Sequence, residues 1–161
     1  METPRCTLRR CTEAMLDDYH QLMSDLRIVR YITGRGLSRR EARQRLKNME
    51  GSDPGQGIFL IYGQENDVLL GIAKFLMNDQ GEMEIGYLLA VEHWGKGLAT
   101  EIAQLLVSQA KLLPGVRVIF GLVDARNLAS IRVLEKCGMR LMGSHNQYGA
   151  ETQKYGLQMK R

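Results

Sequence analysis

The segment that most constrains this chain is residues 84–100. It predicts a strand, a short turn, a glycine-rich loop and the start of a long amphipathic helix. The first N–H groups of a helix have no partner within the helix, and the helix dipole favours negative charge beside them. Gly95 and Gly97 add no side chain that would keep a phosphate at a distance. The segment therefore predicts a binding site for a pyrophosphate.

Two common phosphate-binding loops do not fit this segment. A P-loop requires Gly, four residues and then Gly-Lys-Ser/Thr, whereas Gly97 follows Lys96 here and no glycine lies five residues before Gly95. A dinucleotide-binding fingerprint requires a third glycine or small residue, and an acid about 20 residues further on. Thr100 and Arg117 stand at those places, so neither loop matches.

Two motifs resemble those of the GCN5-related N-acetyltransferase (GNAT) superfamily. Its acetyl-CoA loop, Arg/Gln-x-x-Gly-x-Gly/Ala, is similar to Trp94-Gly95-Lys96-Gly97-Leu98-Ala99, which departs from it at the tryptophan. A tryptophan there, followed by Gly-Lys-Gly and Ala-Thr-Glu, resembles the branch of ribosomal-protein N-terminal acetyltransferases. Asn127-x-x-Ser130 with residues 134–139 is a second, independent match. The resemblance extends over residues 8–159 and implies one N-acetyltransferase domain over residues 1–161.

The order of predicted elements favours an α/β fold. A first strand is followed by helices, a three-stranded meander, a helix, a strand, a helix and a final hairpin. This order predicts a mixed sheet with helices on both faces. The resemblance implies a mostly antiparallel sheet in which the parallel strands 4 and 5 splay apart, so that the pantetheine arm of the cofactor enters the gap. Strands are predicted at residues 6–9, 57–62, 68–77, 82–90, 116–123, 139–146 and 152–159, and helices at 12–23, 26–32, 38–49, 95–113 and 127–137.

The resemblance also implies acetyl-CoA as cofactor, bound largely by backbone groups. Leu88 and Leu89, at a strand end where the family has a bulge, are expected to bind pantetheine, although two ordinary core leucines would look the same. Asn127 is expected to cap a helix and to bind the same arm. The pyrophosphate is expected on the main-chain N–H groups of Gly95, Lys96, Gly97, Leu98, Ala99 and Thr100, with the Thr100 hydroxyl in addition. A plain helix-starting loop and a solvated Lys96 are the alternatives.

Composition sets wider bounds. The chain has 161 residues, 44% apolar and 25% charged, which is typical of a globular domain with a real core. Its net charge of +4 fits either a mildly basic surface or a phosphate-bearing partner such as coenzyme A. Scattered basic residues and few aromatic ones argue against nucleic acid as a partner. No apolar run suits a membrane, and Cys6, Cys11 and Cys137 suggest reduced thiols in the cytoplasm.

Acetylation of an amine from a thioester sets three chemical requirements, which are a free amine, a stabilised oxyanion and a tolerated leaving thiolate. A primary amine is mostly protonated at neutral pH, so a base must remove its proton. Glu84 is the candidate general base, acting through water, although an exposed strand carboxylate is the alternative. The resemblance implies that the Leu89 N–H polarises the thioester carbonyl. Ser130 is a candidate contact or proton donor near the thiol, or simply a residue that solvates the helix end.

The chain departs from the family at two other functional positions. Leu122 stands where some members carry a base glutamate on the fifth strand, and Asp124 nearby is predicted to be a turn residue. Leu134 stands where many members carry a tyrosine acid, so Tyr148 and Tyr155 of the last hairpin are candidates to approach the site instead.

The tryptophan, a cysteine and the histidines are not expected to act as nucleophiles or ligands. Trp94 is predicted to pack over the loop, and Cys137 is a poor nucleophile candidate in a core position. The three histidines, His20, His93 and His145, lack ligand spacing, so no metal site is predicted.

Together these features predict an acetyl-CoA-dependent N-acetyltransferase that works by direct transfer in a ternary complex. The acceptor is a primary amine, either a protein N-terminus or a small molecule. A homodimer is compatible with this interpretation. The alternative is a non-catalytic module of the same fold that binds or senses coenzyme A.

Overall fold

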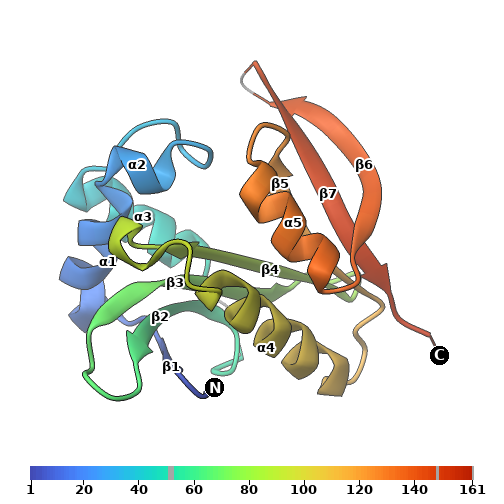
Figure 1. The fold of residues 1–161 in the computed structure, drawn as a ribbon, viewed down its shortest axis with the longest axis horizontal. Coiled ribbons are helices and arrows are strands. Elements are labelled where there is room, and N and C mark those ends of the chain that lie inside the picture. The colour runs from blue at the N-terminus through green and yellow to red at the C-terminus, as the bar shows by residue number, and fades with distance from the viewer. Residues whose placement is uncertain (51–52, 148, 161) are drawn as a thin grey trace.

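The fold is built on a single seven-stranded sheet. Figure 1 presents the computed structural model, which describes residues 1–50, 53–147 and 149–160. The strand order is β1-β2-β3-β4-β5-β7-β6, and every pairing is antiparallel except that of β4 with β5. The strands are β1 (Cys6–Arg10), β2 (Gly57–Gly63), β3 (Leu69–Met77), β4 (Glu82–Leu89), β5 (Val118–Asp124), β6 (Arg140–Gln147) and β7 (Ala150–Gln158). The predicted α/β fold with a mixed sheet is confirmed.

Helices cover both faces of the sheet, as predicted (Figure 1). One buried cluster lies between the sheet and α4 and α5, and a second lies between the sheet and the helices that precede β2. The helices are α1 (Leu16–Met23), α2 (Leu26–Val29), α3 (Arg39–Asn48), α4 (Leu98–Leu112) and α5 (Leu128–Lys136), with 3-10 turns η1 (Glu13–Met15) and η2 (Val91–His93). Among the described residues, no helix is long and apolar enough to span a bilayer.

Local sequence explains where the helices begin. The Ser38 hydroxyl accepts from the Glu41 N–H at 3.1 Å while the Glu41 carboxylate accepts from the Ser38 N–H, which is the predicted capping box of α3. Asn127 caps α5 by accepting from the Ser130 N–H at 3.2 Å. α4 begins at Leu98, later than predicted, because Gly95 and Gly97 have φ of 74° and 77° and cannot belong to a right-handed helix.

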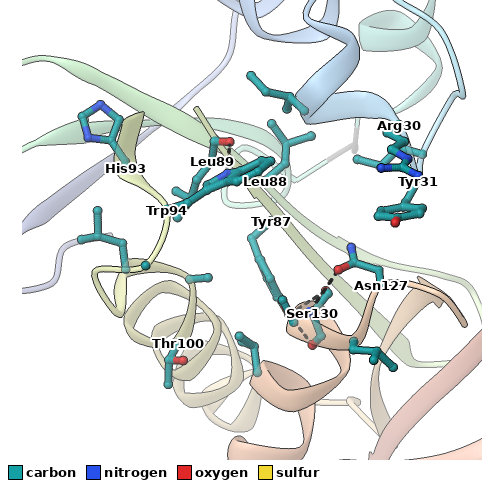
Figure 2. A pocket seen from close by; sticks show the side chains of 18 of the residues that line it. Arg30, Tyr31, Tyr87, Leu88, Leu89, His93, Trp94, Thr100, Asn127 and Ser130 are labelled. Atoms are coloured by element: carbon teal, nitrogen blue, oxygen red, sulfur yellow. Dashed lines mark hydrogen bonds between the residues drawn. The ribbon is translucent and has the colours of Figure 1, made fainter. Parts of the chain in front are cut away.

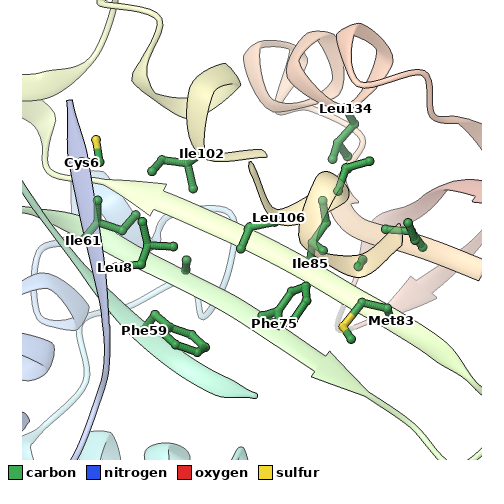
Figure 3. Close-up of a cluster of buried hydrophobic side chains, with 14 of the residues drawn as sticks. Cys6, Leu8, Phe59, Ile61, Phe75, Met83, Ile85, Ile102, Leu106 and Leu134 are labelled. Atoms are coloured by element: carbon green, nitrogen blue, oxygen red, sulfur yellow. The ribbon is translucent and has the colours of Figure 1, made fainter. Parts of the chain in front are cut away.

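Alternation along β4 divides its side chains between the two cores. Met83, Ile85 and Leu89 are buried in the cluster that α4 and α5 cover, and Figure 3 shows the first two beside Leu106 and Leu134. Leu88 packs against the other cluster, beneath α1 and α3. Successive strand residues point to opposite faces, so Glu84 lies on the same face as Leu88.

The sheet opens between β4 and β5. Their parallel pairing is confined to Glu82 with Val118, Met83 with Ile119 and Glu84 with Phe120. Beyond these pairs the strands diverge, which is the predicted splay. The predicted bulge at the end of β4 is absent, because the register with β3 runs without a shift from Met83 to Leu89.

Candidate active site

The glycine-rich loop leaves backbone donors exposed at the start of α4. Gly97 is the N-cap residue and has no side chain to cap the helix, and the first helical bond of this turn runs from the Glu101 N–H to the Gly97 carbonyl at 3.1 Å. The N–H groups of Leu98, Ala99 and Thr100 precede that bond and lack a capping side chain. Together with the helix dipole they form a site suited to an anion.

Arg5 supports this loop from the other end of the chain. Its Nη1 donates to the Lys96 carbonyl at 2.9 Å, and its Nε pairs with Glu101 Oε1 at 3.0 Å. Thr3 Oγ1 donates to the other oxygen of Glu101 at 2.5 Å, so that carboxylate is held away from the loop amides. Sequence reasoning missed Arg5, since more than 90 residues separate it from the loop and no local pattern links them.

Trp94 joins the loop to the end of β4. Its Nε1–H donates to the Leu89 carbonyl at 2.9 Å, although the ring is 51% exposed (Figure 2). The prediction that Trp94 only packs over the loop was therefore incomplete. The bond fixes the loop relative to the strand end and occupies the carbonyl of Leu89.

The strand register decides which backbone groups of β4 face the gap. The Ala90 N–H donates to the Leu70 carbonyl on β3 at 2.8 Å. Hydrogen-bonded pairs alternate in an antiparallel ladder, so Leu88 exchanges its backbone bonds with Ile72, its partner in the register. Leu89 then points its N–H away from β3 into the gap, whereas Leu88 offers only its side chain to the site.

Tyr87 reaches across the gap from β4 to α5, and sequence reasoning missed it. Its hydroxyl donates to the Ser130 carbonyl at 3.2 Å and lies 3.1 Å from the Ser130 hydroxyl (Figure 2). Burial raises the pKa of Tyr87 to about 12, so the phenol stays protonated in the physiological range. Its hydroxyl bonds a partner 43 residues away in the chain, which no local sequence pattern identifies.

One cleft, here called the α4-side cleft, contains most of the predicted cofactor-binding residues. It has a volume of about 690 Å³ and extends from the loop to the first turn of α5. Lys96 is outside its wall and exposed, although the loop carries it. The predicted residues in the wall are Leu88, Leu89, Gly95, Gly97, Leu98, Ala99, Thr100, Asn127 and Ser130.

A second cleft of about 810 Å³, here called the α3-side cleft, opens on the opposite face of the sheet. Its wall includes Arg45 of α3, Lys74 of β3 and Glu84 of β4. Lys74 Nζ lies 2.7 Å from Glu84 Oε2, and both side chains are 25% exposed. The two clefts share Tyr87, Leu88, Asn127 and Ser130, so they meet at the splay between β4 and β5.

Several alternative acid and base positions are now placed. Leu134 is 2% exposed and packs in the core against Gly121, at the inner wall of the α3-side cleft. Tyr155 is buried in the same cluster and lines neither cleft. The suggestion that Tyr155 approaches the site was therefore wrong, and Tyr148 lies outside the described residues. Leu122 is 46% exposed in the wall of the α3-side cleft. Asp124 ends β5 and pairs with Arg126 at 2.7 Å, which lowers the pKa of that carboxyl.

The cysteines are not poised as nucleophiles. Burial raises the pKa of the Cys137 thiol, and the same cause raises the pKa of Cys11 to about 11. Within the described part of the chain, no three His, Cys, Asp or Glu side chains lie together in a way that would hold a metal ion.

Comparisons with known proteins agree with this geometry. An uncharacterized N-acetyltransferase, p20, of Bacillus licheniformis is 31% identical over 91% of this chain and 85% of its own length. A spermidine N-acetyltransferase from Vibrio cholerae, solved with CoA and spermine, shares the fold at a TM-score of 0.80 and 19% identity, with 97% of this chain and 96% of that chain covered. RimL, a ribosomal L7/L12 α-N-protein acetyltransferase solved with coenzyme A, shares it at a TM-score of 0.81 and 19% identity, with 98% and 96% covered.

A family model described as an acetyltransferase (GNAT) domain matches residues 5–140. The loop and the gap between β4 and β5 suit a pyrophosphate followed by an extended arm, so the residues present fit coenzyme A. The chain is therefore a member of the GNAT acetyltransferase family, with acetyl-CoA as its cofactor.

Proposed function

We propose that this enzyme transfers the acetyl group of acetyl-CoA directly to the primary amine of a second substrate held in the α3-side cleft. One observation carries the proposal. The opening between β4 and β5 joins the exposed amides of the loop on one face to Glu84 on the other. An acyl donor and an amine can therefore meet in the gap without sharing a cleft.

The α4-side cleft would hold the cofactor. The N–H groups at the start of α4 would bind the pyrophosphate, with Thr100 adding a hydroxyl. The Leu89 N–H and the Asn127 amide would bind the pantetheine arm where the strands separate. When bound, acetyl-CoA supplies an acetyl group already activated as a thioester. The Leu89 N–H faces the place where negative charge would develop on the carbonyl oxygen.

Glu84 is the general base of the proposal. One carboxylate oxygen, Oε2, bonds Lys74, which leaves Oε1 to accept a proton. Glu84 lies two residues before Gly86, or about 7 Å along the strand. A water molecule between the carboxylate and the amine would therefore carry the proton from the gap to Glu84. Lys74 holds the carboxylate in place through its contact with Oε2 at 2.7 Å.

Ser130 would contact or protonate the departing thiolate of coenzyme A. Its Oγ faces the gap and contacts the Tyr87 hydroxyl, which orients it (Figure 2). A thiol is a fair leaving group, so placement matters more than strong acid catalysis. The loss of the family tyrosine at Leu134 is therefore compatible with activity.

Direct transfer is proposed because none of the cysteines in the described part of the chain is poised to form a covalent acetyl-enzyme. The raised pKa of the half-buried Cys137 thiol keeps it protonated at neutral pH. We expect intersecting initial-rate patterns for acetyl-CoA and amine, rather than the parallel lines of a ping-pong mechanism.

The test is release of free thiol from acetyl-CoA in the presence of a panel of primary amines and short peptides with free N-termini. Turnover with at least one amine, together with calorimetric binding of coenzyme A, supports the proposal. Binding without turnover across the panel would favour the non-catalytic sensing module instead. No binding of coenzyme A would reject the assignment of the α4-side cleft.

A further inference from the structure

The α3-side cleft has an excess of positive charge. Five cationic side chains line it, against two carboxylates, those of Glu84 and Asp124. The cations are Arg30, Arg35, Arg45, Lys74 and Arg126. They come from four separate segments of the chain, so the excess is a property of the folded cleft rather than of one basic run.

Ion pairs neutralise only part of this charge. Lys74 pairs with Glu84, and Arg126 pairs with Asp124, each at 2.7 Å. Arg35 pairs with Glu41, which lies outside the cleft wall.

Arg30 and Arg45 are the remaining cations. Neither has an ion-pair partner within residues 1–50, 53–147 and 149–160. These two guanidinium groups therefore remain available to a ligand, that of Arg45 in the α3-side cleft and that of Arg30 in either cleft, because Arg30 lines both.

Arg45 is the more constrained of the two. Its side chain is half-buried on the inner side of α3, next to the hydroxyl of Tyr19, which is 1% exposed. Burial raises the pKa of Tyr19 to about 12, so the phenol beside Arg45 is neutral and does not cancel its charge. A cation removed from water without an anion is unfavourable, and a guanidinium offers paired donors that match a carboxylate or phosphate.

Arg30 lies where the two clefts meet. Its guanidinium carbon is 5.1 Å from the centre of the Tyr31 ring, and that of Arg126 is 5.3 Å from the same ring. Figure 2 shows Arg30 and Tyr31 together on the segment that follows α2, across the cleft from Leu88. The tyrosine ring thus contacts two cations at the junction of the two clefts.

Resting on the proposed function, we infer that the acceptor is a small primary amine that also carries an anionic group, either a carboxylate or a phosphate. Arg45 binds the anionic group, and Glu84 faces the amine. A second ammonium group would instead meet Arg30 and Arg45, so the cleft disfavours polyamines. One structural neighbour is named as a spermidine N-acetyltransferase, so the acceptor preference inferred here differs from the polyamine in that name.

The test uses matched amines that differ in one end group. At each chain length from two to eight carbons, the ω-amino acid, the aminoalkyl phosphate, the simple alkylamine and the diamine are compared by thiol release. A charge-assisted hydrogen bond contributes enough to raise kcat/KM by about 10- to 100-fold, so the best anionic amine should exceed its alkylamine by that factor. The diamine should be the poorest substrate, and the carboxylate and phosphate arms identify the anion.

Two variants on the same helix localise the effect. Arg45→Gln should raise KM for the anionic amine by about tenfold or more while leaving the alkylamine nearly unchanged. Arg40→Gln makes the same charge change at an exposed position of α3 outside both clefts, and it should leave both substrates unchanged. Should Arg45→Gln fold poorly, Arg30→Gln at an exposed position serves as a second probe.

The outcomes separate this inference from the proposed function. Turnover of alkylamines or diamines as efficient as that of the anionic amines overturns the inference and leaves acetyl transfer intact. An anion preference that survives both Arg45→Gln and Arg30→Gln also overturns it. If no amine is acetylated, calorimetry in the presence of coenzyme A decides, and a diamine that binds as tightly as the ω-amino acid rejects the anionic acceptor.

Discussion

The two clefts that meet between β4 and β5 are built by different means. In the α4-side cleft, the proposed cofactor contacts are backbone groups of one continuous segment, from Leu89 to Thr100, with Asn127 opposite, and side chains of α2, the segment after it and α5 complete the wall. The α3-side cleft relies on side chains from α1, α3, the strands β2 to β5 and β7. A backbone site needs only glycines and a helix start, whereas a side-chain site can change its charge by single substitutions. The comparison suggests that the first cleft fixes the donor and the second selects the acceptor.

The strongest test of the backbone site is Gly97→Glu. It places a carboxylate against the expected pyrophosphate, in a residue with φ of 77°. We expect affinity for coenzyme A to fall by at least about 100-fold, measured by calorimetry.

Gly115→Glu is the matched control for this change. Gly115 has φ of 82° and open space around its Cβ position, so the variant bears the same backbone strain of about 1 kcal/mol far from the loop. Coenzyme A should bind this control normally. Equal losses of affinity in both variants would mean that strain, and not the phosphate site, causes the effect.

The next largest effect is expected in the side-chain site, for Glu84→Gln. Removing the proposed base should lower kcat about 100-fold at pH 7 while affinity for coenzyme A is unchanged. The deficit should shrink as the pH approaches about 10, because the amine then loses its own proton without help. The measurement is the pH dependence of kcat for both proteins.

Glu82→Gln is its control, two residues earlier on the same strand. Glu82 pairs with Lys154 at 3.1 Å and lines neither cleft, so the variant also breaks a half-buried ion pair but away from the gap. An unchanged pH profile in Glu84→Gln, or a matching deficit in Glu82→Gln, would remove Glu84 from the mechanism.

The sequence predicts the residues of the α4-side cleft better than those of the α3-side cleft, because the first depends on local backbone features and the second on contacts between distant segments. The loop was predicted because positive-φ glycines and a helix start are local properties, and the strands and helices followed from periodicity and capping. Arg5, Tyr87 and Arg45 were missed because their roles depend on partners far away in the chain, such as Lys96 and Ser130. Tertiary packing creates these contacts, and no spacing rule encodes them.

Leu134→Tyr tests whether a side chain at position 134, where the family usually has a tyrosine, stays in the core or projects into the gap. Leu134 is 2% exposed, and one of its methyl carbons lies 3.1 Å from where a Cβ on Gly121 would be. A larger, polar side chain should therefore destabilise the fold by about 1–3 kcal/mol in chemical denaturation. Leu128→Tyr on the same helix, at a side chain 59% exposed, should leave stability unchanged. A fully stable, more active Leu134→Tyr would instead show that this position opens to the gap.

The smallest expected effect belongs to Tyr87→Phe, which removes the hydroxyl that links β4 to Ser130 of α5. Loss of its bond to the Ser130 carbonyl at 3.2 Å should lower the free energy of unfolding by about 1 kcal/mol near pH 7. Burial raises the pKa of Tyr87 from 10 to about 12 in the folded protein. The unfolded chain therefore loses this proton first, so the stabilisation is complete below pH 10 and declines between pH 10 and 12.

Tyr19 and Tyr62, whose pKa values burial also raises, remain in both proteins and cancel when the variant is compared with the parent. The difference in the free energy of unfolding between the two proteins should therefore narrow above pH 10 through Tyr87 alone. A difference that stays constant from pH 7 to 12 would mean that the Tyr87 phenol titrates alike in the folded and unfolded chains, so that burial does not raise its pKa. Equal stability of the two proteins at pH 7 would mean that its bonds to Ser130 contribute nothing to holding α5 against β4, and Ser130 would have to be oriented by the Asn127 cap instead.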